Sequence, residues 1–160
     1  MSIVEALHNW YVHDSRPRIL SHHLVELIPK NSSILDVGCG DGLLARLISQ
    51  NRTDVTLKGI DTLVRQRTYI PIEPFDGEMI PYENESFDGV MFVDVLHHSV
   101  DPMILLREAA RVGRKIILIK DRTLHVLFAA QTLRFMDKVG NARHGVSLPY
   151  NYWPKEREMA

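Results

Sequence analysis

A glycine-rich segment directly follows the first strongly apolar run of the chain. Residues 34–42 read Ile-Leu-Asp-Val-Gly-Cys-Gly-Asp-Gly. Glycines in such a turn permit positive φ angles and let ligand atoms approach the backbone. Between a strand and a helix, a turn of this kind is typical of a binding site at the carboxyl end of a parallel sheet.

The spacing and charge of this turn distinguish two kinds of cofactor. The dinucleotide fingerprint is G-x-G-x-x-G, with a pyrophosphate at the helix N-terminus. Here the glycines occupy positions 38, 40 and 42, and Leu43 stands where the third glycine would be. Asp36 and Asp41 flank the turn, and each would repel a pyrophosphate by about 1 kcal/mol or more. S-adenosylmethionine carries a sulfonium and an ammonium and no phosphate, so the charges favour this cofactor.

The segment resembles the first motif of class I S-adenosylmethionine-dependent methyltransferases, and later segments resemble further motifs in the family's order. Gly59-Ile60-Asp61 is similar to the end of strand two, where the resemblance implies that Asp61 binds the ribose hydroxyls. Residues 75–82 resemble the adenine segment, and residues 86–98 lead to a stretch similar to the methionine-side motif. The resemblance covers roughly residues 30–120. It implies S-adenosylmethionine as cofactor and S-adenosylhomocysteine as product, held by Asp36, Gly38, Gly40, Asp61, Leu63, Asp76, Gly77 and Asp94.

Three of these cofactor residues also have a simpler interpretation. An Asp at the end of a strand often only caps a turn or a helix, which applies to Asp61. Asp76 precedes Gly77 and could likewise serve only a turn. Leu63 could cover one face of an adenine ring or belong to the hydrophobic core.

The residues after the fourth and fifth apolar runs could act on the methyl acceptor. His97 and His98 follow the fourth run, where an acceptor would lie, and an imidazole pKa of about 6.5 suits proton removal at neutral pH. Asp121 ends the fifth run and points toward the same site in this fold. We predict catalytic or acceptor-binding roles for these three residues. The alternatives are packing or capping for the histidines and a helix cap for Asp121.

Cys39 and the histidines do not form a recognisable metal site. Cys39 is the only cysteine of the chain, which excludes an internal disulfide and a zinc site built on cysteines. The His, Asp and Glu spacings match no known ligand pattern, so we expect no bound metal. The turn requires a compact side chain at Cys39, and we prefer this interpretation to a reactive thiol.

The elements that position these residues alternate between strand and helix. We predict strands at 33–37, 55–60, 68–72 (weaker), 88–93 and 115–120, and helices at 17–28, 102–112 and 124–138, with a short helix before residue 12. The helix at 102–112 has Asp101 as N-cap, Pro102 at its first position and Gly113 after its end. This order predicts a doubly wound α/β fold with a mostly parallel, Rossmann-like sheet.

The chain length of 160 residues fits one domain. We divide it into N-terminal helices (1–29), a cofactor-binding core (30–121) and a C-terminal helix with a tail (122–160). Family members carry a further antiparallel pair of strands beside strand five, for which the last 20 residues are too few. We therefore expect a truncated or shortened chain. Its fifth strand would be an apolar edge, which predicts self-association.

Composition and charge limit the class of partner. The formal net charge is -1, with basic residues scattered along the chain, so we expect no nucleic acid partner. No apolar run reaches the roughly 18 residues that span a bilayer, and we expect a cytoplasmic protein. Strand four ends without the Asn/Asp-Pro-Pro-Tyr pattern of enzymes that methylate base or glutamine amides. We therefore predict a small-molecule methyl acceptor. The alternative is a methyltransferase-like domain that binds the cofactor or a protein partner without turnover.

Overall fold

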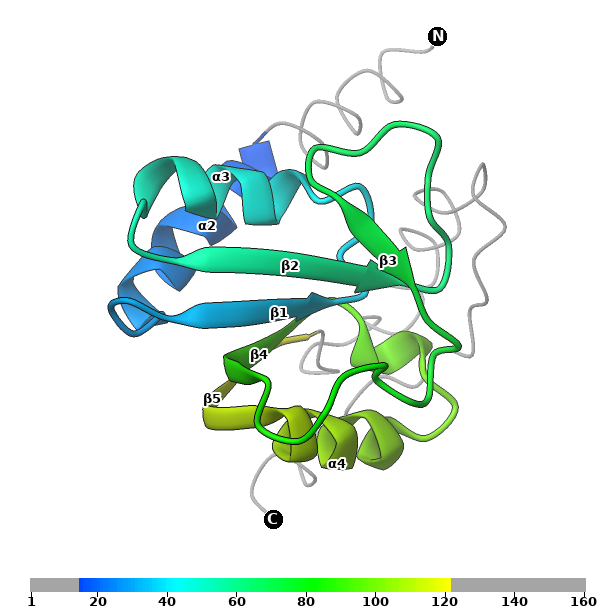
Figure 1. Ribbon diagram of the computed structural model, residues 1–160. Helices are drawn as coiled ribbons and strands as arrows, with labels where there is room; N and C mark the ends of the chain where they lie inside the picture. Colours follow the sequence, from blue (N-terminus) through cyan, green and yellow to red (C-terminus); the bar gives the residue numbers. More distant parts are fainter. Residues whose placement is uncertain (1–14, 122–160) are drawn as a thin grey trace, which may run out of the picture.

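The computed structural model describes residues 15–121. Five strands form one parallel sheet in the order β3-β2-β1-β4-β5 (Figure 1). The doubly wound α/β prediction is confirmed. The strands are β1 (Ser33–Val37), β2 (Thr56–Asp61), β3 (Ile72–Pro74), β4 (Phe87–Val93) and β5 (Gly113–Lys120). The helices are α2 (Arg16–Leu27), α3 (Leu43–Asn51), the 3₁₀ turn η2 (Leu96–His98) and α4 (Pro102–Val112).

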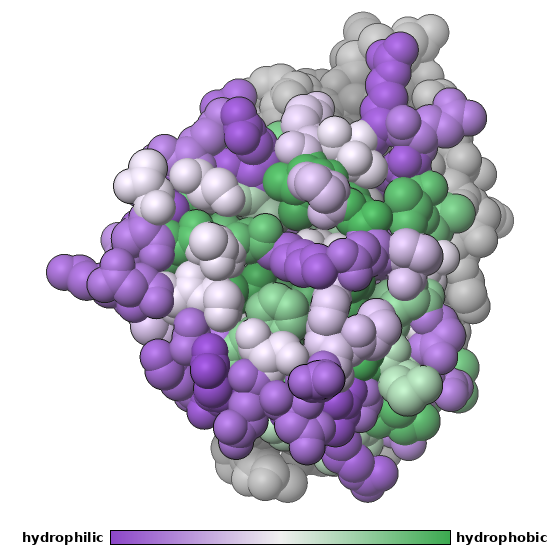
Figure 2. All heavy atoms as spheres, viewed as in Figure 1, coloured by the Kyte–Doolittle hydropathy of each residue, from purple (hydrophilic) through white to green (hydrophobic). Residues whose placement is uncertain are grey.

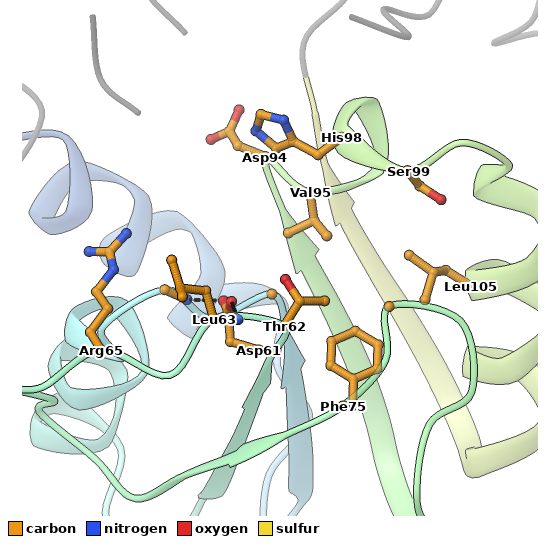
Figure 3. A pocket seen from close by; sticks show the side chains of 13 residues that line it. Asp61, Thr62, Leu63, Arg65, Phe75, Asp94, Val95, His98, Ser99 and Leu105 are labelled. Carbon is orange, nitrogen blue, oxygen red and sulfur yellow. Dashed lines mark hydrogen bonds between the residues drawn. The ribbon is translucent and has the colours of Figure 1, made fainter. Parts of the chain in front are cut away.

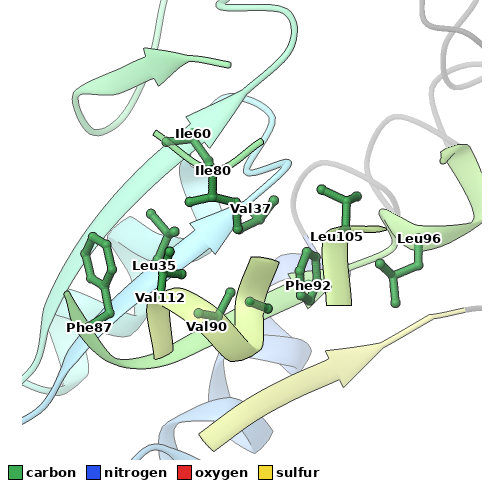
Figure 4. Packing of buried hydrophobic residues seen from close by; sticks show 11 residues of the cluster. Leu35, Val37, Ile60, Ile80, Phe87, Val90, Phe92, Leu96, Leu105 and Val112 are labelled. Carbon is green, nitrogen blue, oxygen red and sulfur yellow. The ribbon is translucent and has the colours of Figure 1, made fainter. Parts of the chain in front are cut away.

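Helices cover both faces of the sheet. Helices α2 and α3 lie together on one face, and α4 lies on the other (Figure 1). Because successive side chains of a strand point to opposite faces, each strand supplies both layers. Ile34 of β1 packs in the cluster under α2 and α3, whereas Leu35 and Val37 pack in the cluster under α4. Figure 4 shows the α4 cluster, in which Leu105 and Val112 meet Val90 and Phe92 of β4.

The predicted helix boundaries are close to those of the structure. Pro17 lies in the first turn of α2, and Pro29 follows its end. The Asp101 side chain caps α4 by accepting a hydrogen bond from the Met103 amide at 3.0 Å, as predicted. Gly113 follows α4 with an ordinary negative φ. Glycine is needed here for lack of room, since a Cβ at this position would lie 2.9 Å from the Ala109 carbonyl oxygen.

The predicted third strand at 68–72 is wrong. Residues 62–71 form a loop, and β3 begins at Ile72. The apolar side chains of the predicted run serve another purpose, because Ile70 packs against Gly42 and the Tyr69 amide donates to the Asp41 carbonyl at 2.8 Å. Tyr69 and Ile70 thus cover the glycine turn, and only Ile72, the last residue of the predicted run, pairs with β2, opposite Gly59. In the view of Figure 2, hydrophilic residues cover most of the periphery, with apolar residues exposed between them.

Strand β5 is the outer strand of the sheet on the β4 side within residues 15–121. The strand is only partly covered, since Ile119 is 52% exposed and Leu118 is its one buried residue. The expected edge is thus present in the described part of the chain, while self-association stays a prediction. The expected helices before residue 12 and at 124–138, and the tail, lie outside the described residues.

Candidate cofactor and acceptor site

A pocket of about 560 Å³ opens at the carboxyl ends of β1, β2 and β4. Its walls come from several parts of the fold (Figure 3). They are the glycine turn, the segments after β2 and β3, the segment after β4 with η2, and α4. The lining residues are Gly38, Gly40, Asp61, Thr62, Leu63, Arg65, Phe75, Gly77, Asp94, Val95, His98, Ser99 and Leu105.

The backbone amides of the glycine turn donate to acceptors of the protein itself. The Gly40 amide donates to the Asp61 carboxylate at 2.7 Å, where a phosphate-binding turn would present a free donor. Four other amides of the turn also have internal acceptors: Gly38, Cys39, Gly42 and Leu43. With these five amides bonded internally and a carboxylate beside them, the turn suits a cationic ligand better than an anion.

Two glycines of the turn are required by both conformation and space. Gly38 has a φ of 70°, and a Cβ at this position would lie 2.7 Å from a methyl carbon of Val95. Gly42 has a φ of 79°, and its Cβ would lie 2.4 Å from Ile70. The turn is therefore packed tightly between β4 and the loop after β2.

Asp36 and Asp41 flank the turn, and we expected both to carry a negative charge that a cationic cofactor would offset. The structure shows a different environment for each. Asp36 is 3% exposed and does not line the pocket. Burial, and then the nearby charge of Asp61, raise its pKa to about 8, so it is largely protonated at neutral pH. Asp41 lies 3.6 Å from the guanidinium of Arg65, which offsets its charge. The charge argument against a pyrophosphate therefore rests on Asp61 and the occupied amides.

Asp61 combines the two interpretations that the sequence left open. Its carboxylate accepts hydrogen bonds from the amides of Gly40 and Leu63, at 2.7 and 2.9 Å, so it does cap the turn. It also lines the pocket (Figure 3). Its role toward a ribose stays a prediction.

The adenine-side residues are divided between pocket and turn. Asp76 accepts hydrogen bonds from the amides of Glu78 and Met79, both at 2.8 Å, and these bonds lower its pKa. Phe75 and Gly77 on either side of it line the pocket, whereas the Asp76 side chain does not. Leu63 lines the pocket and is 42% exposed, so it is not a core residue.

Asp94 lies at the carboxyl end of β4 with a φ of 58°, unusual for a residue other than glycine. It lines the pocket and contacts two cations. Arg16 of α2 pairs with one carboxylate oxygen, and Lys120 of β5 pairs with the other at 2.7 Å. Such strained conformations occur most often at functional sites.

The two histidines occupy different environments. His98 lines the pocket, whereas His97 is 1% exposed and does not line it. The Nδ1 atom of His97 contacts the carboxylate of Asp121, and the His97 amide donates to the same group at 3.2 Å. The two imidazole rings lie 4.1 Å apart between centroids. Asp121 therefore joins the end of β5 to the turn that carries His98.

Several pocket residues were not predicted from the sequence. Arg65 was missed because the residues after Asp61 carry no motif, although its position four residues beyond a predicted ligand was an available signal. Val95, Ser99 and Leu105 were missed because only packing places them at the pocket.

Two further findings concern metals and membranes. Among residues 15–121, no three His, Cys, Asp or Glu side chains come close enough together to hold a metal ion. Burial raises the pKa of the Cys39 thiol above its usual value, which agrees with a packing role. Within the same residues, the helices are too short or too polar to cross a bilayer.

Comparisons with known proteins place this chain in a family. The profile of the family described as "Methyltransferase domain" matches residues 11–154. The 27-O-demethylrifamycin SV methyltransferase of Amycolatopsis mediterranei is 32% identical over 132 residues, which cover 69% of this chain and 48% of that protein. This chain thus matches about half the length of that relative.

Solved structures show the same fold. A SAM-dependent methyltransferase from Thermotoga maritima matches with a TM-score of 0.64 and 16% identity, over 98% of this chain and 73% of the other. A methyltransferase from Haloferax volcanii, solved with its Trm112 activator, matches with a TM-score of 0.64 and 15% identity, over 94% of this chain and 71% of the other. The chain belongs to the methyltransferase domain family, within the class I S-adenosylmethionine-dependent methyltransferases.

Proposed function

We propose that the chain binds S-adenosylmethionine in the pocket above the glycine turn and transfers its methyl group to a small-molecule acceptor. The observation that carries the proposal is the Asp61 carboxylate, which lines the pocket and accepts a hydrogen bond from the Gly40 amide, so that the turn presents a negative charge where a phosphate would need a donor. In this proposal the Asp61 carboxylate binds the ribose hydroxyls. Leu63, Phe75 and Gly77 border the adenine.

The acceptor side of the proposal is built on His98. When bound, the cofactor supplies an electrophilic methyl group, so the protein's task is to align the acceptor and exclude water. His98 lines the pocket beside Asp94 and is our candidate for taking a proton from the acceptor. His97 and Asp121 then act by holding the turn that carries His98.

The acceptor class comes from sequence and family. The Amycolatopsis relative is named for methylation of 27-O-demethylrifamycin SV, which supports a small-molecule acceptor here. The Haloferax neighbour instead suggests the second candidate function, in which a methyltransferase-like domain binds a protein partner without turnover by itself.

Calorimetric titration with S-adenosylhomocysteine tests the cofactor. We expect one site per chain and, at a hundredfold excess of ligand over Kd, stabilisation by about 2.7 kcal/mol. Absence of binding at millimolar ligand would reject the proposal. Transfer of a labelled methyl group in an acceptor screen, with His98→Gln as the impaired variant, then separates an enzyme from a binding domain.

Replacing Asp61 tests the ribose contact. Asp61→Ala should weaken S-adenosylhomocysteine binding about tenfold or more, because ribose hydroxyls would lose a charged acceptor. Asp61→Asn is the matched control, since its one amide oxygen can still accept from the Gly40 amide although not from both amides. If Asp61 only caps the turn, Asp61→Asn recovers affinity in proportion to the thermal stability that it recovers. If it holds the ribose, affinity remains reduced in both variants.

A further inference from the structure

The carboxyl of Asp36 is the one buried acid near the pocket that the proposed function leaves without a task. It lies in β1, two residues before Gly38, and is 3% exposed. Within residues 15–121 it forms no hydrogen bond and no ion pair. A buried carboxylate without partners is costly, so the neutral form is favoured.

The sheet register places Asp36 close to Asp61. Asp36 pairs with Gly59 across β1 and β2, and Asp61 follows Gly59 by two positions on the same sheet face. Gly59 has no side chain, and the Cys39 sulfur fills the space, 2.6 Å from where a Cβ would be. The two carboxyls therefore lie on one face of the sheet, directly below the turn.

Within residues 15–121, no cation on the surrounding elements offsets the charge of Asp36. Across β4 its register partner is Met91, which is uncharged. The charged and titratable side chains of α2 and α3 on this face of the sheet are exposed, apart from Arg16, which pairs with Asp94: Arg18, His22, His23, Glu26 and Arg46. In the turn, Asp41 pairs with Arg65. Asp61 is the one charged neighbour with a marked effect on Asp36, and the effect is to favour its protonated form.

We propose that Asp36 carries a proton in the ligand-free protein and releases it to the solvent when S-adenosylmethionine binds. The O–H bond of the carboxyl breaks and a buffer base takes the proton. The reason is charge: a sulfonium and an ammonium above the turn interact favourably with a second carboxylate, which the empty site cannot stabilise. This inference rests on the proposed cofactor.

Proton release makes cofactor affinity depend on pH. Below the pKa of Asp36 in the free protein, about 8, part of the binding energy is used to remove the proton. The affinity for S-adenosylmethionine should therefore rise with pH between 6 and 7, by up to tenfold per pH unit. S-adenosylhomocysteine lacks the sulfonium charge, so its binding should release less of a proton and depend less on pH.

Calorimetry in buffers of different ionisation enthalpy measures the number of protons released. At pH 7 we expect close to one proton per S-adenosylmethionine bound for the parent chain and close to none for Asp36→Asn. The His98→Gln variant is the control, because it removes the imidazole that lines the pocket and should leave the release intact.

Each outcome bears on the inference separately from the proposed function. If S-adenosylmethionine gives no binding heat with the parent chain, the proposed cofactor is rejected. Binding of normal stoichiometry with an affinity unchanged between pH 6 and 8 overturns only the role of Asp36. Release that persists in Asp36→Asn and disappears in His98→Gln also overturns it. If Asp36→Asn does not fold, the pH series on the parent chain and on His98→Gln together decide, because a dependence that His98→Gln abolishes overturns the role of Asp36.

Discussion

Asp36 and Asp88 are both well-covered acids on neighbouring parallel strands, yet they lie at opposite ends of the sheet. Asp88, at the amino end of β4, accepts from the Ser33 amide and hydroxyl at 2.9 and 3.1 Å, and Lys115 lies 3.0 Å away. The hydrogen bond from the Ser33 amide and that from Lys115 lower its pKa to about 2. Asp36, at the carboxyl end of β1, has no such partners, and its pKa is raised to about 8.

The difference between the two acids indicates that the amino end of the sheet serves stability and the carboxyl end serves ligand binding. At the amino end, the charge of Asp88 joins three strands, since its partners come from the starts of β1 and β5. At the carboxyl end, the turn of Gly38 and Gly40 lines the pocket. Asp36 has no partner there, so in our proposal it becomes charged only when a cationic ligand binds. Parallel sheets place their ligands at that end.

Comparing a glycine at each end of the sheet should give the largest effect. Gly38→Ala introduces a Cβ 2.7 Å from Val95 at a positive φ, and we expect a loss of about 3 kcal/mol of stability together with loss of S-adenosylhomocysteine binding. Gly89→Ala also overlaps its neighbour, with a Cβ 2.7 Å from Ile116, but at an ordinary φ in the strand. Urea unfolding and calorimetry of both variants should show lower stability in each and retained binding only in Gly89→Ala. Equal loss of binding would contradict the division between the two ends.

The stability of the ligand-free chain should fall with pH because of Asp36. Between its unfolded pKa of 3.8 and its folded pKa of about 8, the folded state holds a proton that the unfolded state has lost. Stability from this group is therefore present at low pH and decreases as pH rises, by about 2 kcal/mol between pH 6 and 8. Urea unfolding should show this slope in the parent chain and a reduced slope in Asp36→Asn. A parent chain more stable at pH 8 than at pH 6 would argue against the buried proton.

Asp88 should show the opposite dependence on pH and a smaller effect. Its folded pKa of about 2 lies below its usual value of 3.8, so its contribution to stability is present above pH 4 and is lost as pH falls toward 2. Asp88→Asn should lower the stability at pH 7, measured by urea unfolding, and leave the affinity for the ligand unchanged. If Asp88→Asn changed the affinity for the ligand but not the stability, the stabilising role given to Asp88 would be wrong.

Much of the fold was predictable because its signals are local. Asp101 and Pro102 mark the start of α4, and the apolar runs mark four of the five strands within a residue or two. The third strand was wrong because Thr68, Tyr69 and Ile70 have the composition of a strand, while tertiary packing uses Ile70 to cover Gly42. Composition does not reveal which surface an apolar side chain covers.

The sequence alone determined the kind of turn, its place after a strand and the acids beside it, because these features depend only on residues close together in the chain. Only the tertiary structure decided which of those acids is charged. Asp36 lies under the turn without donors, Asp41 meets Arg65, and Asp61 accepts from Gly40. Charge in a protein depends on burial and on partners from distant strands, and neither is encoded at the position of the acid itself.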